Sequence, residues 1–241
     1  RLFSALDYYE QPTPPLFSRI LIPPDPFELK NVPLMEVRAS ERRYWRSTFY
    51  DQYLGSGWSN SDWLTLKLEG EDSCLQEEIV GYALRRIITQ TFHLLQPQRG
   101  VLYAASQPLC VDVPAIAQIN RLPDQEREKG ASDESIPPVA LSALFAESPS
   151  AALYTALSSV SYADVESLRG DGGEYPLWVR ERYLALPASL PKRVRDLSRQ
   201  VVQGHLNAYD KATAIEAYLR NIPYNRDIEA PPEGRDIVDY F

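Results

Sequence analysis

Histidine and cysteine are scarce in this sequence of 241 residues, which has two of each. The two thiols, Cys74 and Cys110, cannot build a metal cage, and the sequence holds no Cys-x-x-Cys pair. A disulfide between them would close a long loop and would suit an exported protein, whereas two buried or idle thiols are the alternative. We therefore expect neither a bound metal nor a cofactor.

The two histidines offer little for catalysis, because a nucleophile needs a base that a third group orients. His93 lies in the strand-like run "TQTFHLL", which favours a structural, side-chain-paired role. His205 lies near the end of a predicted helix, where a cation interacts favourably with the helix dipole. The sequence has no Gly-x-Ser-x-Gly, P-loop, His-Glu-x-x-His or Gly-x-Gly-x-x-Gly motif, and no pattern pairs a histidine with a cysteine. No catalytic residue is therefore predicted.

Long apolar runs and a surplus of basic residues are also lacking. No run approaches the roughly 18–20 residues that a membrane-spanning helix needs, and the opening "RLFSALDYYEQP" has too short an apolar stretch for a signal peptide. The formal net charge of -8 gives a field that repels phosphate backbones, so nucleic acid is not expected as a partner. The start at Arg1 rather than Met and the abrupt end at Phe241 predict a soluble fragment of a longer protein.

Proline and aromatic residues, in contrast, are plentiful. Twenty prolines stand against eleven glycines, and fifteen tyrosines with four tryptophans favour a β-rich, loop-rich architecture over a helical bundle. The prolines of "PTPP" and "IPPDP" predict an extended, irregular arm over residues 1–35. Residues 36–164 have the pattern of strands and residues 165–241 that of helices. We therefore expect an α+β fold, in which a sandwich-like β domain precedes a short helical segment.

Alternation and aromatic content place the strands of residues 36–164. Strands are predicted in "MEVRAS" and in "RRYWRSTFYDQY", which precedes a turn at "GSGW". The run "EEIVGYALRRIITQTFHLL" is ambiguous between helix and strand; its second half is predicted as a strand that forms a hairpin with "VLYAAS". A second hairpin is predicted from "VALSALFA" and "AALYTALSSVSYA". Residues 59–78 and the charged residues 121–138 are predicted loops.

Two helices are predicted in the C-terminal segment. "LPKRVRDLSRQVVQGHL" has apolar residues near one face and Pro191 close to its start, where a missing N–H costs little. "NAYDKATAIEAYLRNI" follows, with Asn207 as its N-cap and Pro223 as its stop. Its apolar stripe comprises Ala212, Ile215, Tyr218, Leu219 and Ile222.

Carboxylates and aromatic residues are the remaining candidates for chemistry. Glu71, Asp72 and Asp124 lie in polar stretches typical of solvated loops, and no pair is singled out for acid–base work on glycosides. Aromatic residues gather at Tyr44, Trp45, Phe49, Tyr50, Tyr53, Trp58 and Trp63. They could form a platform that stacks on sugars, but their placement on both faces of the predicted strands favours a role in the β core. A binding or scaffold module for glycan or protein partners is the alternative function.

Three stretches carry a family resemblance: "RRYWRSTFYDQYLGSGW", "EYPLWVRERYLALPASLPKRVRDLSRQVVQGHLNAYDKATAIEAYLRN" and "IPYNRDIEAPPEGRDIVDYF". In this order and spacing they resemble the extracytoplasmic region of bacterial membrane-anchored transglutaminase-like proteins. The similarity runs from about Pro26 to Phe241 and is weakest over residues 59–78 and 121–138. Its signature residues are Tyr44, Trp45, Arg46, Gly57, Trp58, Tyr183, Pro187, Asp236, Asp239 and Phe241.

The resemblance implies where the chemistry lies. In that family the segment matching "GRDIVDYF" leads into a Gly-x-Cys motif, whose cysteine begins a helix and is the nucleophile of a Cys-His-Asp triad. A helix N-terminus stabilises a thiolate, which suits this placement. The present sequence ends before that cysteine, and Cys74 and Cys110 match no catalytic position of the family. The resemblance therefore assigns no catalytic residue to this chain.

The resemblance also implies a location and a role. The family has transmembrane helices before the region matching residues 1–35, which implies an extracytoplasmic position at the cell membrane. The β-rich region would be an accessory domain, and residues 165–241 the opening of an incomplete transglutaminase-like, papain-like core. The complete enzyme is expected to attack a Gln carboxamide of a protein, form a thioester and pass it to an amine or water. This chain would support or position the rest of that core and present protein substrates to it. Because the helical segment would lack the rest of that core, we expect an exposed patch near Ile215, Tyr218 and Leu219 or a tendency to self-associate.

Overall fold

The strands of the structure, a computed structural model, lie where inward and outward side chains alternate. The described residues are 19–21, 32–60, 63–68, 73–74, 83–96, 100–120, 140–148, 151–175, 177–225 and 231–241. In β12 (Leu153–Ser161), Tyr154, Ala156, Ser158 and Val160 are buried, and the residues between them are more exposed. Successive side chains of a strand point to opposite faces, so β12 offers one face to the core.

Several predictions concern residues outside the described part of the chain. These are the loop at 121–138, most of the arm at 1–35, and the carboxylates Glu71, Asp72 and Asp124. Within the arm, β1 (Arg19–Leu21) is a strand, so the prediction of irregular backbone is wrong there. It pairs antiparallel with β4 (Gly57–Ser59), which satisfies backbone groups that a lone extended segment would leave to solvent.

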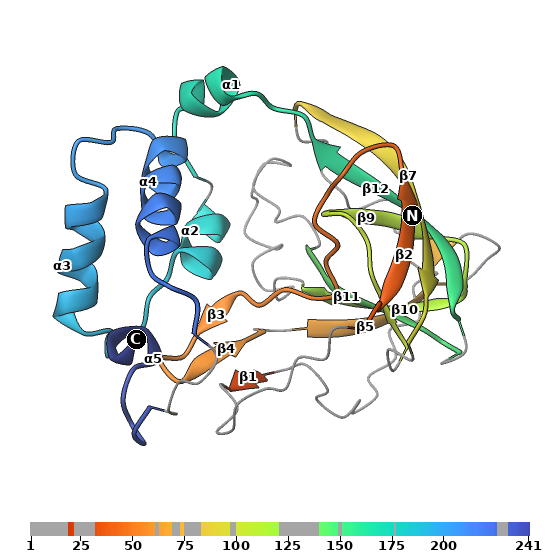
Figure 1. The fold of residues 1–241 in the computed structure, drawn as a ribbon, viewed down its shortest axis with the longest axis horizontal. Helices are drawn as coiled ribbons and strands as arrows, with labels where there is room; N and C mark the ends of the chain where they lie inside the picture. The colour runs from red at the N-terminus through yellow and green to blue at the C-terminus, as the bar shows by residue number, and fades with distance from the viewer. Residues whose placement is uncertain are drawn as a thin grey trace, which may run out of the picture. The chain divides into compact units, whose positions relative to one another are not determined.

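Two antiparallel sheets form the β-rich part of the chain (Figure 1). One has five strands, in the order β2 (Met35–Ala39), β7 (Arg85–Leu94), β12, β9 (Pro108–Val111) and β6 (Ser73–Cys74). The other has four strands, in the order β5 (Trp63–Leu68), β10 (Ala115–Asn120), β11 (Ala140–Ala146) and β8 (Val101–Leu102). The expectation of an antiparallel, β-rich region in a mixed α and β chain is confirmed.

A single apolar cluster receives side chains from both sheets. Phe92 of β7 stacks on Tyr154 of β12 with ring centroids 5.1 Å apart, and Trp45 meets Phe92 edge-on at 5.5 Å. The four-stranded sheet contributes Leu66 of β5 and Leu144 of β11, both of them buried. Because each sheet buries one face in the same cluster, this region has the two-layer arrangement of a β-sandwich.

Both predicted hairpins are wrong, although the strands within them are confirmed. β7 pairs with β2 and β12, whereas the next strand, β8, pairs with β11 in the other sheet. β11 and β12 likewise follow each other in sequence but belong to different sheets. Each of these strands has one face in the shared core, so the chain crosses between sheets where a turn along the same sheet had been expected.

Two further predictions need correction in the described residues. The segment 59–78, predicted as a loop, contains β5 and β6; in β5, Leu66 and Leu68 are buried and Lys67 is exposed, the alternation expected of a strand. Conversely, the predicted strand "RRYWRSTFYDQY" is mostly irregular, with isolated bridges at Arg46 and Thr48 before β3 (Gln52–Tyr53). Of its aromatic residues, Trp45 packs against the core and Tyr53 is buried, whereas Tyr44 is exposed.

The chain divides into two compact units. The described residues of Asn31–Tyr50 and Asn60–Tyr162 form the first unit, which contains both sheets of the sandwich. Asp51–Ser59 and Ala163–Phe241 form the second together with β1, so a short hairpin interrupts the first unit in sequence. The second unit holds the sheet β1-β4-β3 and the helices α1 (Val165–Gly170), α2 (Leu177–Tyr183), α3 (Lys192–Val201), α4 (Ala208–Arg220) and α5 (Ile237–Tyr240).

Local signals account for the helix starts. Asn207 accepts a hydrogen bond from the backbone N–H of Asp210 at 2.8 Å and caps α4, as predicted. Pro191 immediately precedes α3, also as predicted. Asp164 caps α1 by accepting from the N–H of Ser167 at 2.8 Å. Within the described residues, every helix is too short or too polar to cross a membrane.

Candidate functional site

A glycine turn joins β3 and β4 at the predicted "GSGW" turn, which is confirmed. Gly55 has a φ of +79°, a left-handed value that favours glycine, and Leu54 donates its N–H to the carbonyl of Gly57 at 2.9 Å. Ile237 donates its N–H to the carbonyl of Gly55 at 2.8 Å. A Cβ atom on Gly55 would lie 3.3 Å from Oδ2 of Asp236, so this turn and the start of α5 are in close contact.

Asp236 caps α5 and ties it to the hairpin. Its Oδ1 atom accepts hydrogen bonds from the hydroxyl of Tyr53 at 2.8 Å and from the backbone N–H groups of Val238 and Asp239, each at 3.0 Å. Two of these donors would otherwise be unpaired at the helix N-terminus. The third comes from β3. One carboxylate oxygen thus determines both where α5 begins and what it is attached to.

Tyr53 is buried, and its ring centroid lies 5.1 Å from that of Trp58. Burial and, secondly, the hydrogen bond to Asp236 raise the pKa of Tyr53 to about 12. A tyrosine hydroxyl is protonated at neutral pH in any case, and the raised pKa keeps this one a donor into the alkaline range. A hydrogen bond to an ionised acceptor is stronger than one between neutral groups, so this contact is among the stronger polar links of the second unit.

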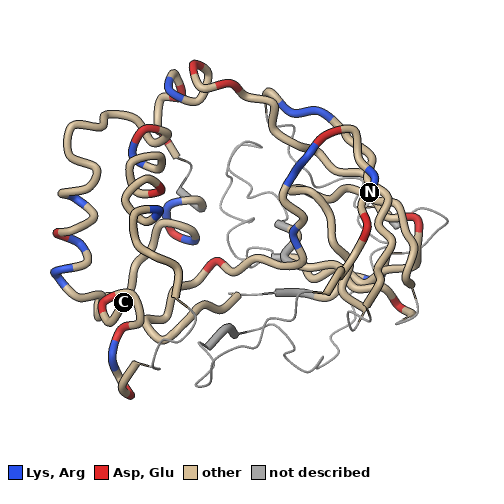
Figure 2. The backbone as a smooth tube through the Cα atoms, in the orientation of Figure 1, with Lys and Arg blue, Asp and Glu red and all other residues tan. Residues whose placement is uncertain are grey.

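Asp239 holds α5 to the start of α3. Lys and Arg positions recur along α3, as Figure 2 shows in blue. Arg193 donates both to the carboxylate of Asp239 and to its backbone carbonyl, and Nε of Arg235 lies 4.0 Å from the same carboxylate. The Arg193 hydrogen bond holds the pKa of Asp239 below its ordinary value. The two carboxylates of the signature therefore attach α5 to two different neighbours, the hairpin and α3.

A buried ion pair holds the base of the hairpin. Nε of Arg182 in α2 lies 3.5 Å from Oδ2 of Asp51, and the two side chains are 7% and 0% exposed. Asp51 also donates its backbone N–H to the carbonyl of Ser59 at 3.2 Å, across the base of the hairpin. Because isolated charges are costly away from water, each partner of this pair depends on the other.

The signature residues divide between the two units. In the first unit, Trp45 packs against the core, whereas Tyr44 is 93% exposed. Arg46 exchanges backbone hydrogen bonds with Ala104 and donates from Nη2 to the carbonyl of Leu141 at 3.2 Å, so it supports the edge of the sandwich.

The other signature residues lie in the second unit: Gly57, Trp58, Tyr183, Pro187, Asp236, Asp239 and Phe241. Asp236 and Asp239 lie at α5, and Trp58 packs against Tyr53, the hydrogen-bond partner of Asp236. Gly57 lies in the hairpin, where its carbonyl accepts from Leu54. The carbonyl of Pro187 accepts a hydrogen bond from Arg195 at 3.1 Å, which braces the connection from α2 to α3. Tyr183 and Phe241 have exposed side chains.

The residues that hold α5 and the base of the hairpin were largely not predicted from the sequence. Asp51, Arg182 and Arg193 carried no signal, and Tyr53 was noted only as one aromatic residue among several. One signal was present, because an acidic N-cap followed three positions later by a second acid resembles a capping box and marks the start of α5. Nothing local could have paired Tyr53 with Asp236.

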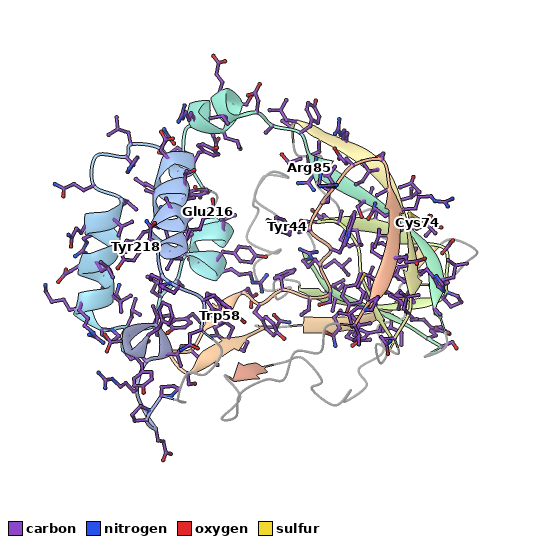
Figure 3. All side chains as sticks on the ribbon, viewed as in Figure 1. Tyr44, Trp58, Cys74, Arg85, Glu216 and Tyr218 are labelled. Carbon is purple, nitrogen blue, oxygen red and sulfur yellow. A yellow bond between two sulfur atoms is a disulfide. The ribbon has the colours of Figure 1, made fainter. Side chains whose placement is uncertain are left out.

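The aromatic residues do not form one exposed row in the described part of the chain. Trp45 packs in the first unit, whereas Trp58 projects from β4 in the second and is 43% exposed (Figure 3). The side chain of Trp63 lies outside the described part. Tyr53 is buried and engaged by Asp236. The alternative of a sugar-stacking surface gains no support from these positions.

Both cysteines form a disulfide, which resolves the alternatives left open by the sequence. Cys74 of β6 and Cys110 of β9 are bonded, with their Cα atoms 4.0 Å apart on paired strands. His93 has Nδ1 3.5 Å from a carboxylate oxygen of Glu36 on the neighbouring strand, which confirms the expected side-chain pairing. His205 is exposed. The chain therefore holds no free thiol that could act as a nucleophile.

Comparisons with known proteins give one similarity. No family model and no solved structure matches the chain. The chain is similar to "Uncharacterized protein YebA" of Bacillus subtilis (strain 168), with 25% identity over 242 residues. The alignment covers 90% of this chain and 29% of that protein, so the chain spans less than a third of its relative's length. At this identity the similarity does not assign a family.

Proposed function

We propose that this chain is the non-catalytic, extracytoplasmic part of a transglutaminase-like cysteine enzyme and that it supports and positions the catalytic core. In this proposal the first unit is an accessory β-sandwich, and the helices of the second unit open the transglutaminase-like core. The parent enzyme attacks Gln carboxamides of proteins and transfers the acyl group to an amine or to water. Its nucleophile is a cysteine downstream of Phe241.

The observation that carries this proposal is that the helices of the second unit bury few of their side chains. None of the described residues of α1, α3, α4 and α5 is buried. On α4, Ile215, Tyr218 and Leu219 are 38%, 40% and 50% exposed, as the sequence predicted. Amphipathic helices gain most of their stability by packing one face on another layer. These helices therefore resemble one layer of a core whose other layer comes from the remainder of the enzyme.

The disulfide supports the extracytoplasmic location. Disulfides form and persist in oxidising compartments and are rare where thiols are kept reduced. The bond between Cys74 and Cys110 spans 36 positions of sequence and joins the two last strands of the five-stranded sheet. It is therefore part of the framework of the sandwich. The membrane anchor of the parent enzyme is part of the proposal and rests on the family resemblance alone.

The proposal is tested by incorporation of a fluorescent primary amine into a glutamine-containing protein. Three proteins are compared: this chain, the natural protein extended through its downstream Cys, His and Asp, and the same extended protein with that Cys changed to Ala. We expect incorporation, or release of ammonia in the absence of amine, only from the extended protein with its Cys intact. Activity of the short chain, or of the Cys→Ala protein, would refute the proposal.

A further inference from the structure

The start of α5 is held by residues that are remote in sequence. Tyr53 reaches Asp236 across 183 positions, and the neighbouring Gly55 carbonyl accepts the N–H of Ile237. On its other side, α5 is bound by Arg193 through Asp239. A helix of four residues has too few internal hydrogen bonds to be stable alone. Its position is therefore set by these outside contacts.

The packing around Asp236 is closely matched to the hairpin. Oδ1 accepts three hydrogen bonds, while Oδ2 is buried and has no hydrogen-bond partner among the described residues. A side chain at position 55 would bring its Cβ to 3.3 Å from Oδ2, so the glycine allows the approach. A buried oxygen without a partner costs free energy. This cost is consistent with a role for Asp236 in which the position of the carboxylate matters more than hydrogen bonds to both of its oxygens.

We propose that Tyr53 is a positioning residue, which acts through Asp236 to set the location and direction of α5 and of the polypeptide that follows it. This inference rests on the proposed function, in which the nucleophilic cysteine lies shortly downstream of α5. The hydroxyl of Tyr53 touches no reacting atom. It fixes where α5 is attached to the hairpin, and thereby where the thiol that follows α5 meets its histidine and its substrate.

Small displacements of a nucleophile have large kinetic effects. Misplacement by about 1 Å, caused by a change far from the chemistry, can lower a rate roughly 100-fold. Catalytic groups therefore need a supporting shell that locks them in place. Here the supporting shell is the hydroxyl of Tyr53, which donates to a carboxylate that also caps the helix. The contact is maintained throughout the neutral pH range.

The anchor is tested first in the chain itself by hydrogen exchange. Tyr53→Phe removes the hydroxyl and keeps the ring, so the amides of Val238 and Asp239 should exchange roughly tenfold faster or more, since a lost link of this kind is worth about 1.5 kcal/mol or more. Tyr50→Phe is the matched control, because the Tyr50 hydroxyl is buried and has no hydrogen-bond partner among the described residues. Exchange that is equal in Tyr53→Phe and the unchanged chain would overturn the inference.

The positioning role is tested in the extended protein by steady-state kinetics of amine transfer. Tyr53→Phe should lower kcat roughly 10- to 100-fold while KM stays within about twofold, because the substrate site is untouched and the thiol is misplaced. Asp236→Asn keeps an acceptor oxygen and should retain more activity than Asp236→Ala. A merely structural role would lower the amount of folded protein and leave kcat per active site, counted by thiol titration, unchanged.

The two arms separate the two proposals. If the unchanged extended protein transfers no acyl group, the proposed function fails and the catalytic consequence of Tyr53 fails with it, while hydrogen exchange still decides whether the anchor exists. If the extended protein is active and Tyr53→Phe has an unchanged kcat, the positioning role alone is overturned. Faster exchange together with a lower kcat, both absent in Tyr50→Phe, is the expected result.

Discussion

The two units of this chain are stabilised by different forces. In the first, large side chains such as Phe92, Leu102 and Tyr154 are at most 2% exposed and pack in one cluster. In the second, only Tyr53 and Leu190 are buried apolar side chains among the described residues. Apolar burial is the largest favourable contribution to folding, so the sandwich is expected to be the more stable unit.

Polar groups also play different roles in the two units. In the sandwich, the fully buried Gln90 donates to the carbonyl of Ile88 and accepts from Ala105 and Ser158, at 2.8 to 3.0 Å. This network satisfies a polar group inside an apolar core. In the second unit the polar contacts are themselves the main links between elements, as where Arg169 of α1 binds Asp210 of α4 at 2.9 Å. The comparison teaches that the first unit is held by an apolar core, whereas polar contacts link several elements in the described part of the second.

The contrast between the two units would be weakened most if the buried Arg182–Asp51 ion pair contributed nothing to the stability of the second unit. Arg182→Met leaves the Asp51 carboxylate buried without its guanidinium, so the second unit should lose about 3–5 kcal/mol of unfolding free energy. Hydrogen exchange of α2 and of the hairpin measures this loss. The double variant with Asp51→Leu should recover much of it, because two apolar partners replace two charges. A single variant as stable as the unchanged chain would contradict the prediction.

The same substitution in each unit sharpens the comparison directly. Leu102→Ala empties a site that is 2% exposed, and should cost about 2–5 kcal/mol of unfolding free energy in the sandwich. Leu219→Ala removes the same atoms from a site that is 50% exposed, and should cost less than about 0.5 kcal/mol. Urea unfolding followed by circular dichroism measures both. Equal costs would mean that α4 is covered in solution.

Reduction of the disulfide should act on one unit only. The bond between Cys74 and Cys110 lies in the sandwich, and its loss should cost that unit about 2–4 kcal/mol. The paired variant Cys74→Ser with Cys110→Ser should show the same loss without reductant. Peptide-resolved hydrogen exchange should leave α3 and α4 unchanged. A comparable loss in those helices would show that the two units unfold together.

Alkaline pH should weaken the hairpin of the second unit through Tyr53. The pKa of Tyr53 is raised to about 12 in the folded chain, above its ordinary value near 10, so the folded state retains a proton that the unfolded state releases. The contribution is therefore present below pH 10 and is lost as the pH rises towards 12. The difference in stability between the unchanged chain and Tyr53→Phe should shrink over that window. A difference independent of pH would contradict this.

Self-association should be the weakest effect. The exposed stripe of α4, with Ile215, Tyr218 and Leu219, offers an apolar surface that a second copy can cover at high concentration. Sedimentation velocity over a range of concentrations measures this, and Leu219→Lys should abolish it. Thr213→Ala, on the same helix, serves as the control. A strict monomer at every concentration would remove this prediction while leaving the other predictions in place.

Local features of the fold could be read from the sequence with good success. The cap at Asn207, the start of α3 after Pro191 and the turn at Gly55 depend on residues within a few positions of each other. The strand of residues 85–94 was recognised because β-branched side chains favour extended backbone. β5 was not predicted, although "WLTLKL" alternates, because the residues around it are polar and favour a loop.

Strand pairings and contacts between remote side chains could not be predicted from local sequence. Two apolar strands with a turn between them are equally compatible with a hairpin in one sheet and with a crossing between two, and β7–β8 and β11–β12 follow the second course. The candidate site was predicted in part, since Asp236 and Asp239 were singled out by family resemblance. Their partners Tyr53 and Arg193 were not, because a hydrogen bond between remote segments leaves no periodic trace in either one.

The sequence by itself determined the local choices: which stretches are extended, where the helices begin, and that one face of α4 would be apolar. It could do so because backbone sterics, capping and side-chain period act within a single turn or strand. Only the tertiary structure decided that Cys74 meets Cys110, that the strands cross between sheets, and that Tyr53 donates to Asp236, the N-cap of α5. Those choices depend on the burial of apolar surface from segments that are distant in sequence. The free energy of this burial is gained only when the whole chain folds.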